Sequence, residues 1–385
     1  MLPLEKHGPG FIEGHTGFAL FFEAAARAVK PGLLEKTGYH LECAAIQFTH
    51  LSRPSVGLHS GLSGLGWAVS RLARRHPELE AEELCTTVDE AVEAEFQRDP
   101  WPYPCDIRDG LTGLVLYAME RLPHPSARKL LERMAVKLEE AAERSEEGCT
   151  WAMPRGYWSI HGKDATFPRG LYTLGVAHGI PGALAAAALL HALDAGRPRM
   201  QALLEEGFRW VARQARPGHP DFPHYLHGTE RFADERFSWC VGNPGITSVL
   251  WWAARTWGHP EWQARTLEWA TAVAREALER RPGVSSNMCC GTAGTAQVFL
   301  RLFHATGRPV FEEAAVRWVE HTLALRRPGL GPGGYTFEQD PRRPAANLHF
   351  GAAGIALSLL AAASSQVPDW DEAFLFSLAP PAPTP

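Results

Sequence analysis

The sequence lacks any run of apolar residues suited to a membrane span or a secretion signal. The longest apolar stretch, residues 176–193, contains His178, Pro181 and His191, so a buried helix explains it better than a membrane span. The first eleven residues include Glu5 and Lys6 and no apolar core of a signal peptide. These absences predict a cytoplasmic protein, with any membrane association made through partner proteins.

Charge and cysteine usage exclude further classes. The formal net charge is −5 and no block of like charge occurs, so nothing resembles the basic surface of a nucleic-acid-binding protein. The seven cysteines are an odd number spread over 385 residues, which does not suit the disulfide framework of a small secreted domain. In a reducing compartment, clustered cysteines instead indicate a metal site or catalysis.

The sequence does contain a repeat. The pattern Gly-x-x-Gly opens an apolar, alanine-rich segment seven times, at intervals of 47 to 69 residues. The pairs are Gly14/Gly17, Gly61/Gly64, Gly110/Gly113, Gly179/Gly182, Gly242/Gly245, Gly291/Gly294 and Gly351/Gly354. Such a period indicates a repeated unit too small to bury its own apolar face. It predicts a single domain over 1–378, followed by a disordered, proline-rich tail over 379–385.

Two kinds of helical segment alternate along this repeat. Runs such as GIPGALAAAALLHAL are apolar all round, so a helix made of them must be covered on every side. The segments between them, such as 126–145 and 261–281, carry one apolar stripe and a charged face. We therefore predict an all-α fold of two concentric helical layers, an α/α toroid, with the glycine pairs at one rim. Glycine there would allow backbones to approach closely.

Residues with useful chemistry collect just before the glycine pairs. Counting back from the first glycine of each pair, His178 and Cys290 stand at position −1, and Cys240 and Cys289 stand at position −2. Three cysteines in register predict a zinc ion with three protein ligands and one open position, the arrangement of a catalytic zinc site. The alternative is that cysteines are buried apolar residues. It suits the cysteines outside these positions, which are Cys43, Cys85, Cys105 and Cys149.

Further residues are candidates for catalysis. His178 could be a fourth ligand, a general acid or base, or a buried core histidine. Asp106 and Asp109 precede Gly110 by four residues and one, and of the two, Asp109 better fits a helix N-cap. Arg236 could stabilise an anionic intermediate or simply lie on the surface.

Two long connections, 148–175 and 217–237, lead into the repeats that carry these residues. Loops of this length are usually functional or disordered, so we predict that they form substrate-binding rims; ordinary surface loops are the alternative. The candidate substrate-binding residues are Tyr157, Trp158, Trp239, His59 and His349. Core packing explains Trp239 equally well, and a structural role suits both histidines.

The motifs SWCVGNPG, MCCGTAG and VAHGIPG, with CDIRDGLTG and LHFGAAGI, resemble those of the LanC family, the lanthionine synthetase cyclases. The resemblance covers nearly the whole chain. It implies an α/α toroid of seven inner and seven outer helices. It also implies an enzyme that adds a peptide cysteine thiol across dehydroalanine or dehydrobutyrine, forming a lanthionine or methyllanthionine thioether ring.

The resemblance also implies residue roles. Cys240 and Cys289 match zinc ligands, and Cys290 stands where standalone cyclases typically have histidine, as in the three-cysteine variant of bifunctional synthetases. His178 and Asp106 match the two acid/base positions, and Arg236 matches an arginine near the metal. The implied partners are a dehydrated precursor peptide, a separate dehydratase and a transporter.

Two other functions fit the same residues. One is a LanC-like enzyme that adds glutathione or another small thiol to dehydrated residues. The other is a zinc-stabilised binding scaffold without catalysis, against which His178 and Asp106 argue. A glycosidase of the same fold would need paired carboxylates, and no such pair stands out.

Overall fold

The computed structural model describes residues 7–153, 171–216, 219–227, 230–232, 237–340, 343 and 345–378. The predicted disordered tail, 379–385, lies outside this range. The described chain divides into two compact units. Unit 1 comprises Met1–Val88, Phe237–Trp239 and Ala274–Asp371, and unit 2 comprises Asp89–Arg236, Cys240–Val273 and Glu372–Pro385. A single domain over 1–378 stays a prediction.

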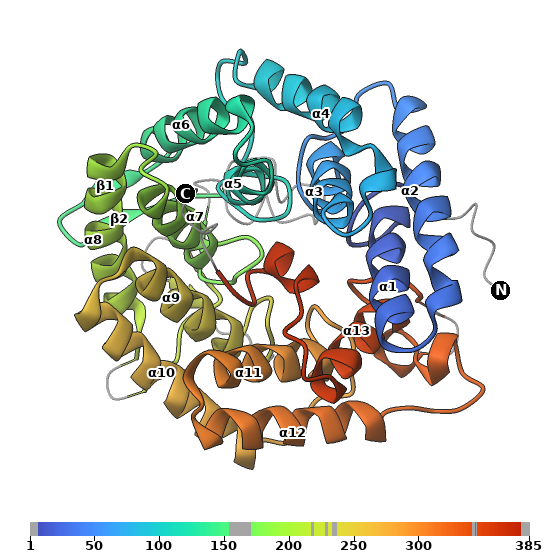
Figure 1. Ribbon diagram of the computed structural model, residues 1–385. Coiled ribbons are helices and arrows are strands. Elements are labelled where there is room, and N and C mark those ends of the chain that lie inside the picture. The colour runs from blue at the N-terminus through green and yellow to red at the C-terminus, as the bar shows by residue number, and fades with distance from the viewer. Residues whose placement is uncertain are drawn as a thin grey trace. The chain divides into compact units, whose positions relative to one another are not determined.

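Helices dominate both units (Figure 1). Within the described ranges, seven begin at the glycine pairs: α1 (His15–Ala28), α3 (Leu62–Ala73), α5 (Leu111–Glu120), α7 (Ile180–Ala192), α9 (Asn243–Trp257), α11 (Thr292–Thr306) and α13 (Ala352–Ala363). Six alternate with them: α2 (Leu34–Thr49), α4 (Ala81–Glu95), α6 (Pro125–Glu140), α8 (Arg197–Gln214), α10 (Pro260–Glu279) and α12 (Pro309–Ala324). After α13 the described chain forms only a short 3-10 helix, η7 (Trp370–Phe374), where a seventh outer helix was expected.

The two kinds of helix differ in burial as their sequences predict. Every residue of α7 from Ile180 to Leu190 is buried, whereas α8 buries one face and exposes the other. In unit 2, α7 packs against α5, α8 and α9. In unit 1, α1 packs against α2 and α13, and α11 packs against α12 and α13. None of the helices in the described ranges combines the length and apolar character that a bilayer crossing requires.

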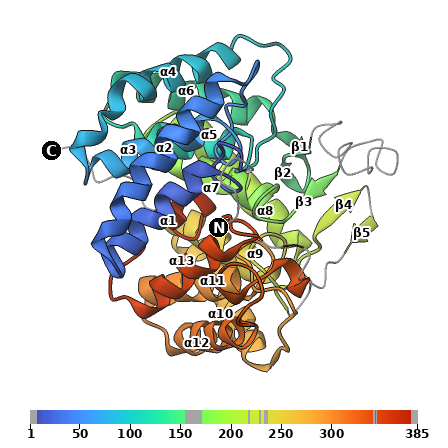
Figure 2. The same ribbon diagram turned by 90° about the vertical axis from the view of Figure 1, so that its right-hand side faces the viewer.

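Five short strands complete the described structure: β1 (Glu143–Ser145), β2 (Gly148–Thr150), β3 (Tyr172–Thr173), β4 (Tyr225–His227) and β5 (Glu230–Phe232). Strand β1 occupies a segment that the sequence suggested would continue α6, which instead ends at Glu140. β3, β4 and β5 form an antiparallel sheet (Figure 2). The two long connections therefore pair with each other, since β3 comes from one and β4 from the other.

The glycine pairs allow a loop to fold back tightly over the start of each helix. In five repeats the first helical N–H donates to the carbonyl seven residues upstream; Leu62 N to Ser55 O, for example, is 2.8 Å. This bond satisfies a backbone donor that the helix itself leaves unpaired. A Cβ on Gly61 or Gly64 would collide with the carbonyl oxygen six residues before it. The glycines are thus required mainly by the loop of their own repeat.

The second glycine also allows contact with a neighbouring repeat, as the sequence suggested. A Cβ on Gly354 would lie 3.2 Å from the Cβ of Met288, and one on Gly17 would lie 2.8 Å from Leu348. All four residues belong to unit 1.

We predict that Gly294→Ala destabilises the protein by at least about 2 kcal/mol, because the new Cβ would collide with the Met288 carbonyl. Gly38→Ala is the matched control. Gly38 lies inside α2 with nothing within 4 Å of the added Cβ. Alanine there should stabilise the protein by about 1 kcal/mol through helix propensity. Urea unfolding of the three proteins measures both changes, and equal stabilities would contradict the account.

A buried histidine pair joins α1 to α2. The Nδ1 atoms of His15 and His40 are 2.8 Å apart, so one ring donates and the other accepts. Burial, together with the smaller effects of His15, Lys36 and His7, lowers the pKa of His40 from 6.5 to about 4. The native state therefore favours neutral His40, whereas the unfolded chain binds a proton below about pH 6.5.

We expect His40 to make stability fall as the pH drops from 6.5 towards 4, because the unfolded state gains a proton first. In a His40→Phe variant, the melting temperature should decline less steeply over this interval. Thermal unfolding at pH 7, 5.5 and 4 tests the difference. Parallel pH profiles of the two proteins would refute the assignment.

Candidate functional site

In unit 1, the loops that precede the helices of the glycine repeat are connected to each other by backbone hydrogen bonds. These bonds involve the residue at position −2 of each loop. The Cys289 N–H donates to the His349 carbonyl at 3.2 Å, and the His349 N–H donates to the Ile12 carbonyl at 3.0 Å. The N–H groups of Phe11 and Ile12 both donate to the His59 carbonyl, at 3.0 and 3.2 Å. The loops before α11, α13, α1 and α3 are thus held in fixed register.

Unit 2 has equivalent bonds. The Val176 N–H donates to the Cys240 carbonyl at 2.8 Å, and the Ile107 N–H donates to the Ala177 carbonyl at 3.4 Å. A Cβ on Gly175 would lie only 2.7 Å from the Cys240 oxygen, so this approach needs glycine. The loops before α5, α7 and α9, which carry Asp106, His178 and Cys240, are therefore connected through their backbones.

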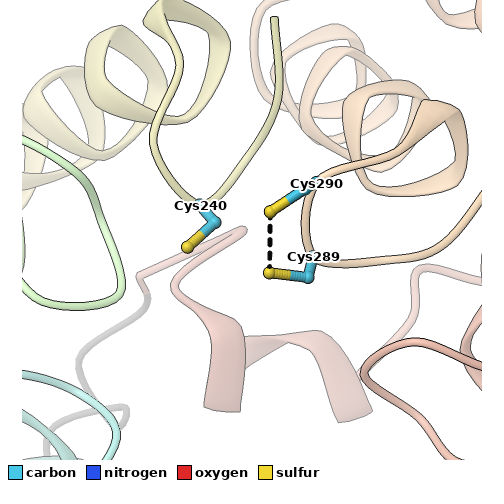
Figure 3. Close-up of side chains that lie close together, drawn as sticks. All are labelled: Cys240, Cys289 and Cys290. Carbon is cyan, nitrogen blue, oxygen red and sulfur yellow. Dashed lines mark hydrogen bonds between the residues drawn. The ribbon is translucent and has the colours of Figure 1, made fainter. Parts of the chain in front are cut away.

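The three cysteines predicted as metal ligands form one group. The sulfur atoms of Cys240, Cys289 and Cys290 all lie within 4.8 Å of one another. Figure 3 shows them on the loops that lead into α9 and α11. The Cys289 and Cys290 sulfurs are 3.1 Å apart, and none of the three cysteines is in a disulfide. Three convergent sulfur ligands, two of them buried, could hold a metal ion that prefers thiolate.

His178 and Asp106 form a hydrogen-bonded pair within unit 2. His178 Nδ1 lies 2.7 Å from Oδ2 of Asp106, whose side chain is only 1% exposed. Because a carboxylate accepts, His178 carries a proton on Nδ1, and Nε2 is the ring nitrogen that does not bond Asp106. Nearly a quarter of the His178 side chain, 23%, remains exposed. The pair is the arrangement of an oriented acid/base histidine.

A recurring Asp or Asn holds the turn before the helix. At position −4, Asp106 Oδ1 accepts from the Asp109 N–H at 3.0 Å, and Asn287 Oδ1 accepts from the Cys290 N–H at 2.8 Å. Asn347 accepts from Phe350 in the same way. Asp106 thus fixes its own loop while it holds His178. Asp109, which by position fitted a helix cap better than Asp106, is not the cap residue, since the N-cap of α5 is Gly110.

The sequence reasoning missed two supporting residues. Asn287 holds the backbone of Cys290, and the Thr173 hydroxyl donates to the His178 carbonyl at 2.6 Å. Alignment of position −4 across the repeats could have identified Asn287. Thr173 has no comparable signal, because it belongs to β3 in the long connection.

Two of the four cysteines that lie outside positions −1 and −2 have raised pKa values. Burial raises the pKa of the Cys149 thiol to about 12, and burial followed by the charge of Asp106 raises that of Cys105 well above its usual range. Cys85 is buried as well, with its sulfur 3.7 Å from the Gly66 carbonyl oxygen. Thiols in such surroundings are poor nucleophiles.

The predicted substrate-binding residues lie in varied surroundings. Trp239 is 1% exposed. His59 is buried and stacks on Phe11, while His349 is buried with Nδ1 3.8 Å from Glu13. Their backbones belong to the connected loops, and a role of their side chains in substrate binding stays a prediction. Tyr157, Trp158 and Arg236 lie outside the described residues.

Comparison with known families gives a match over almost the whole chain. A model of the family "Lanthionine synthetase C-like protein" matches residues 6–375. The chain belongs to the lanthionine synthetase C-like family. The resemblance noted in the sequence motifs is thereby confirmed at the level of the family.

Solved structures show the fold of this family member. Nisin cyclase matches with a TM-score of 0.75 at 16% identity, over 95% of this chain and 92% of that protein. The predicted fold class is thus confirmed. A sugar epimerase from a ruminal bacterium matches with a TM-score of 0.50 at 10% identity, over 91% of this chain and 87% of that one. Proteins of different activity therefore share the fold, so activity must be argued from the site.

The His178–Asp106 pair leads to a prediction. Asp106→Asn should lower kcat for the addition of thiols to a dehydrated peptide about 10²- to 10⁴-fold. An amide stabilises a charged imidazole and fixes the tautomer of the ring less well than a carboxylate does. Asp109→Asn in the same loop should change kcat little, since its side chain contacts Arg108 at 3.4 Å. Steady-state kinetics together with metal content provide the test. Equal loss in both variants, or metal loss with Asp106→Asn, would point to a structural role.

Proposed function

We propose that this protein is a zinc-dependent lanthipeptide cyclase. It adds cysteine thiols of a dehydrated precursor peptide to dehydroalanine or dehydrobutyrine and forms (methyl)lanthionine rings. The observation that carries the proposal is the group of three cysteine sulfurs within 4.8 Å of one another, in a chain whose family model spans residues 6–375. The hydrogen-bonded pair of His178 and Asp106 supports it.

The cysteine group fits zinc by the chemistry of its donors. Cys240, Cys289 and Cys290 supply three thiolates, the soft ligands that zinc accepts, and leave room in a four-coordinate site for one more ligand. Bound zinc supplies an environment in which a coordinated thiol is deprotonated near neutral pH. The hydrogen bond from the Cys290 N–H to Asn287 fixes the loop that carries two of the ligands.

The addition needs one proton removed and one delivered. The substrate thiol loses its proton to water, the sulfur bonds to the β-carbon as the double bond opens, and the α-carbon takes up a proton. We assign this last proton to Nε2 of His178, the ring nitrogen that does not bond Asp106. Asp106 orients the ring and stabilises its charged form.

The remaining residues have secondary roles in the proposal. Arg236 would offset negative charge that develops on the substrate carbonyl. Trp239, His59, His349, Tyr157 and Trp158 would contact the peptide. A separate dehydratase, and a transporter for the product, would be the partner proteins in the cytoplasm.

Two alternatives make different predictions. An enzyme that adds glutathione would use the same residues with a small thiol as the nucleophile. A zinc-stabilised scaffold would have no use for a buried aspartate aligned on a partly exposed histidine, so the pair of His178 and Asp106 argues against it.

Cys240→Ala should reduce bound zinc from about one ion per chain to near zero and abolish thioether formation, because two thiolates hold zinc poorly. Cys43→Ala is the control, since Cys43 is half-buried and stands outside the cysteine group. Elemental analysis gives the metal content. Alkylation of residual thiols in a dehydrated cysteine-containing peptide, followed by mass spectrometry, gives activity.

Each result has a definite meaning. Full activity of Cys240→Ala would exclude the zinc mechanism. Zinc binding without ring formation, combined with addition of glutathione to the same dehydrated peptide, would favour the small-thiol reaction.

A further inference from the structure

Unit 1 contains a large cavity that none of the proposed catalytic residues lines. Its volume is about 1320 Å³. The walls come from α1, α2 and α13, from the end of α12, and from the connection between α12 and α13. We call this cavity the α1/α2/α13 groove.

One side of the α1/α2/α13 groove is a continuous aromatic surface. Phe18, Phe21 and Phe22 lie on one face of α1 at helical spacing, and Tyr39 and His40 come from α2. His40 stacks on Phe22 with ring centroids 5.2 Å apart and lies 5.3 Å from both Phe18 and Tyr39. Since burial lowers the pKa of His40 to about 4, this surface is uncharged at neutral pH.

The side formed by α13 and the loop before it combines small residues with the larger Ile355, Leu359 and Tyr335. Ala352, Ala353 and Ala356 line it from the helix, and Gly331 and Gly333 line it from the loop. Because the alanine and glycine side chains are small, they leave open space opposite the aromatic surface. Ala352 and Ala356 are only partly buried, so the groove reaches the surface.

Charged residues at the edge of the groove leave it with an excess of positive charge. Lys36, Arg326 and Glu35 all line the cavity and are exposed. Lys36 Nζ lies over the Phe22 ring at 5.6 Å, and Arg326 Nε donates to the Gly333 carbonyl at 2.9 Å. None of the ion pairs between described residues involves these three side chains. Among the described residues that line the cavity, the two cations outnumber the one anion.

We propose that the α1/α2/α13 groove binds an amphipathic peptide helix whose apolar face is flanked by acidic residues. The volume exceeds the roughly 300–1,000 Å³ of typical small-molecule pockets. A groove between helices with an aromatic wall suits an apolar helix face that presents residues at i, i+3, i+4 and i+7. Lys36 and Arg326 complement acids beside that face. The inference goes beyond the proposed cyclase activity and does not depend on it.

The test uses a defined probe and full-length protein. The probe is a fluorescent peptide of about four helical turns, with leucines along one face and glutamates beside them. A second peptide has lysines in place of the glutamates, and a third is a scramble of the first. A fluorescent long-chain fatty acid tests the other occupant that an apolar pocket with a cationic edge would accept. Fluorescence anisotropy gives each Kd.

Charge reversal tests the edge of the groove. The double variant Lys36→Glu/Arg326→Glu should weaken binding of the acidic peptide about tenfold or more and strengthen binding of the basic one. The control Lys30→Glu/Arg327→Glu makes the same charge change at exposed residues that do not line the cavity, and should shift Kd less than about twofold.

Filling the groove tests its interior. Ala356→Trp should abolish binding of the acidic peptide, whereas Ala362→Trp, at an exposed site on the same helix outside the cavity, should not. Three results would overturn the proposal: no saturable binding of the acidic peptide, equal binding by the scrambled peptide, or binding of the fatty acid alone. Because the charge variants alter exposed residues only, they decide the question even if Ala356→Trp fails to fold.

Discussion

The structure depends on a loop that turns back over the start of a helix and gives its carbonyl to the first helical N–H. This bond recurs in five repeats, and it requires glycine because a Cβ at either position of the pair would collide with the loop. The loops then bond to each other through their backbones, from Cys289 to His349 and onwards in unit 1, and from Val176 to Cys240 in unit 2. Side chains at positions −1 and −2 are thereby carried on a rigid backbone, as an ordered site needs.

The same loop explains why the candidate metal ligands and acid/base groups stand at equivalent positions before the glycine pairs. Asp106 and Asn287 occupy position −4 and use one side-chain oxygen to hold the turn. In the repeat of Asp106, the second oxygen remains to accept from His178, so one carboxylate both builds its loop and orients the histidine. Cys290 stands on the turn that Asn287 holds, at the position that Asp109 occupies in the repeat of Asp106.

Much of this could be predicted from the sequence, because the glycine pairs mark the start of each buried helix and set the register of the cysteines. The helices at all seven pairs and the convergence of Cys240, Cys289 and Cys290 follow from that pattern. The role of Asp106 in its own turn did not, since a lone aspartate before a helix suggests a cap first. The pairing of β3 with β4 was also hidden, because strands of two or three residues leave no alternation to read.

The loop over the helix start has a consequence for how such a protein can evolve. Its shape comes from glycines and backbone carbonyls and, in three repeats, from one Asp or Asn, so the side chain at −1 or −2 takes little part in folding the loop. Val241 and Phe350 occupy position −1 in two repeats, whereas His178 and Cys290 occupy the same position in two others. Mutation can therefore replace the reactive group of one repeat without rebuilding its backbone, and a new donor set can arise from single substitutions.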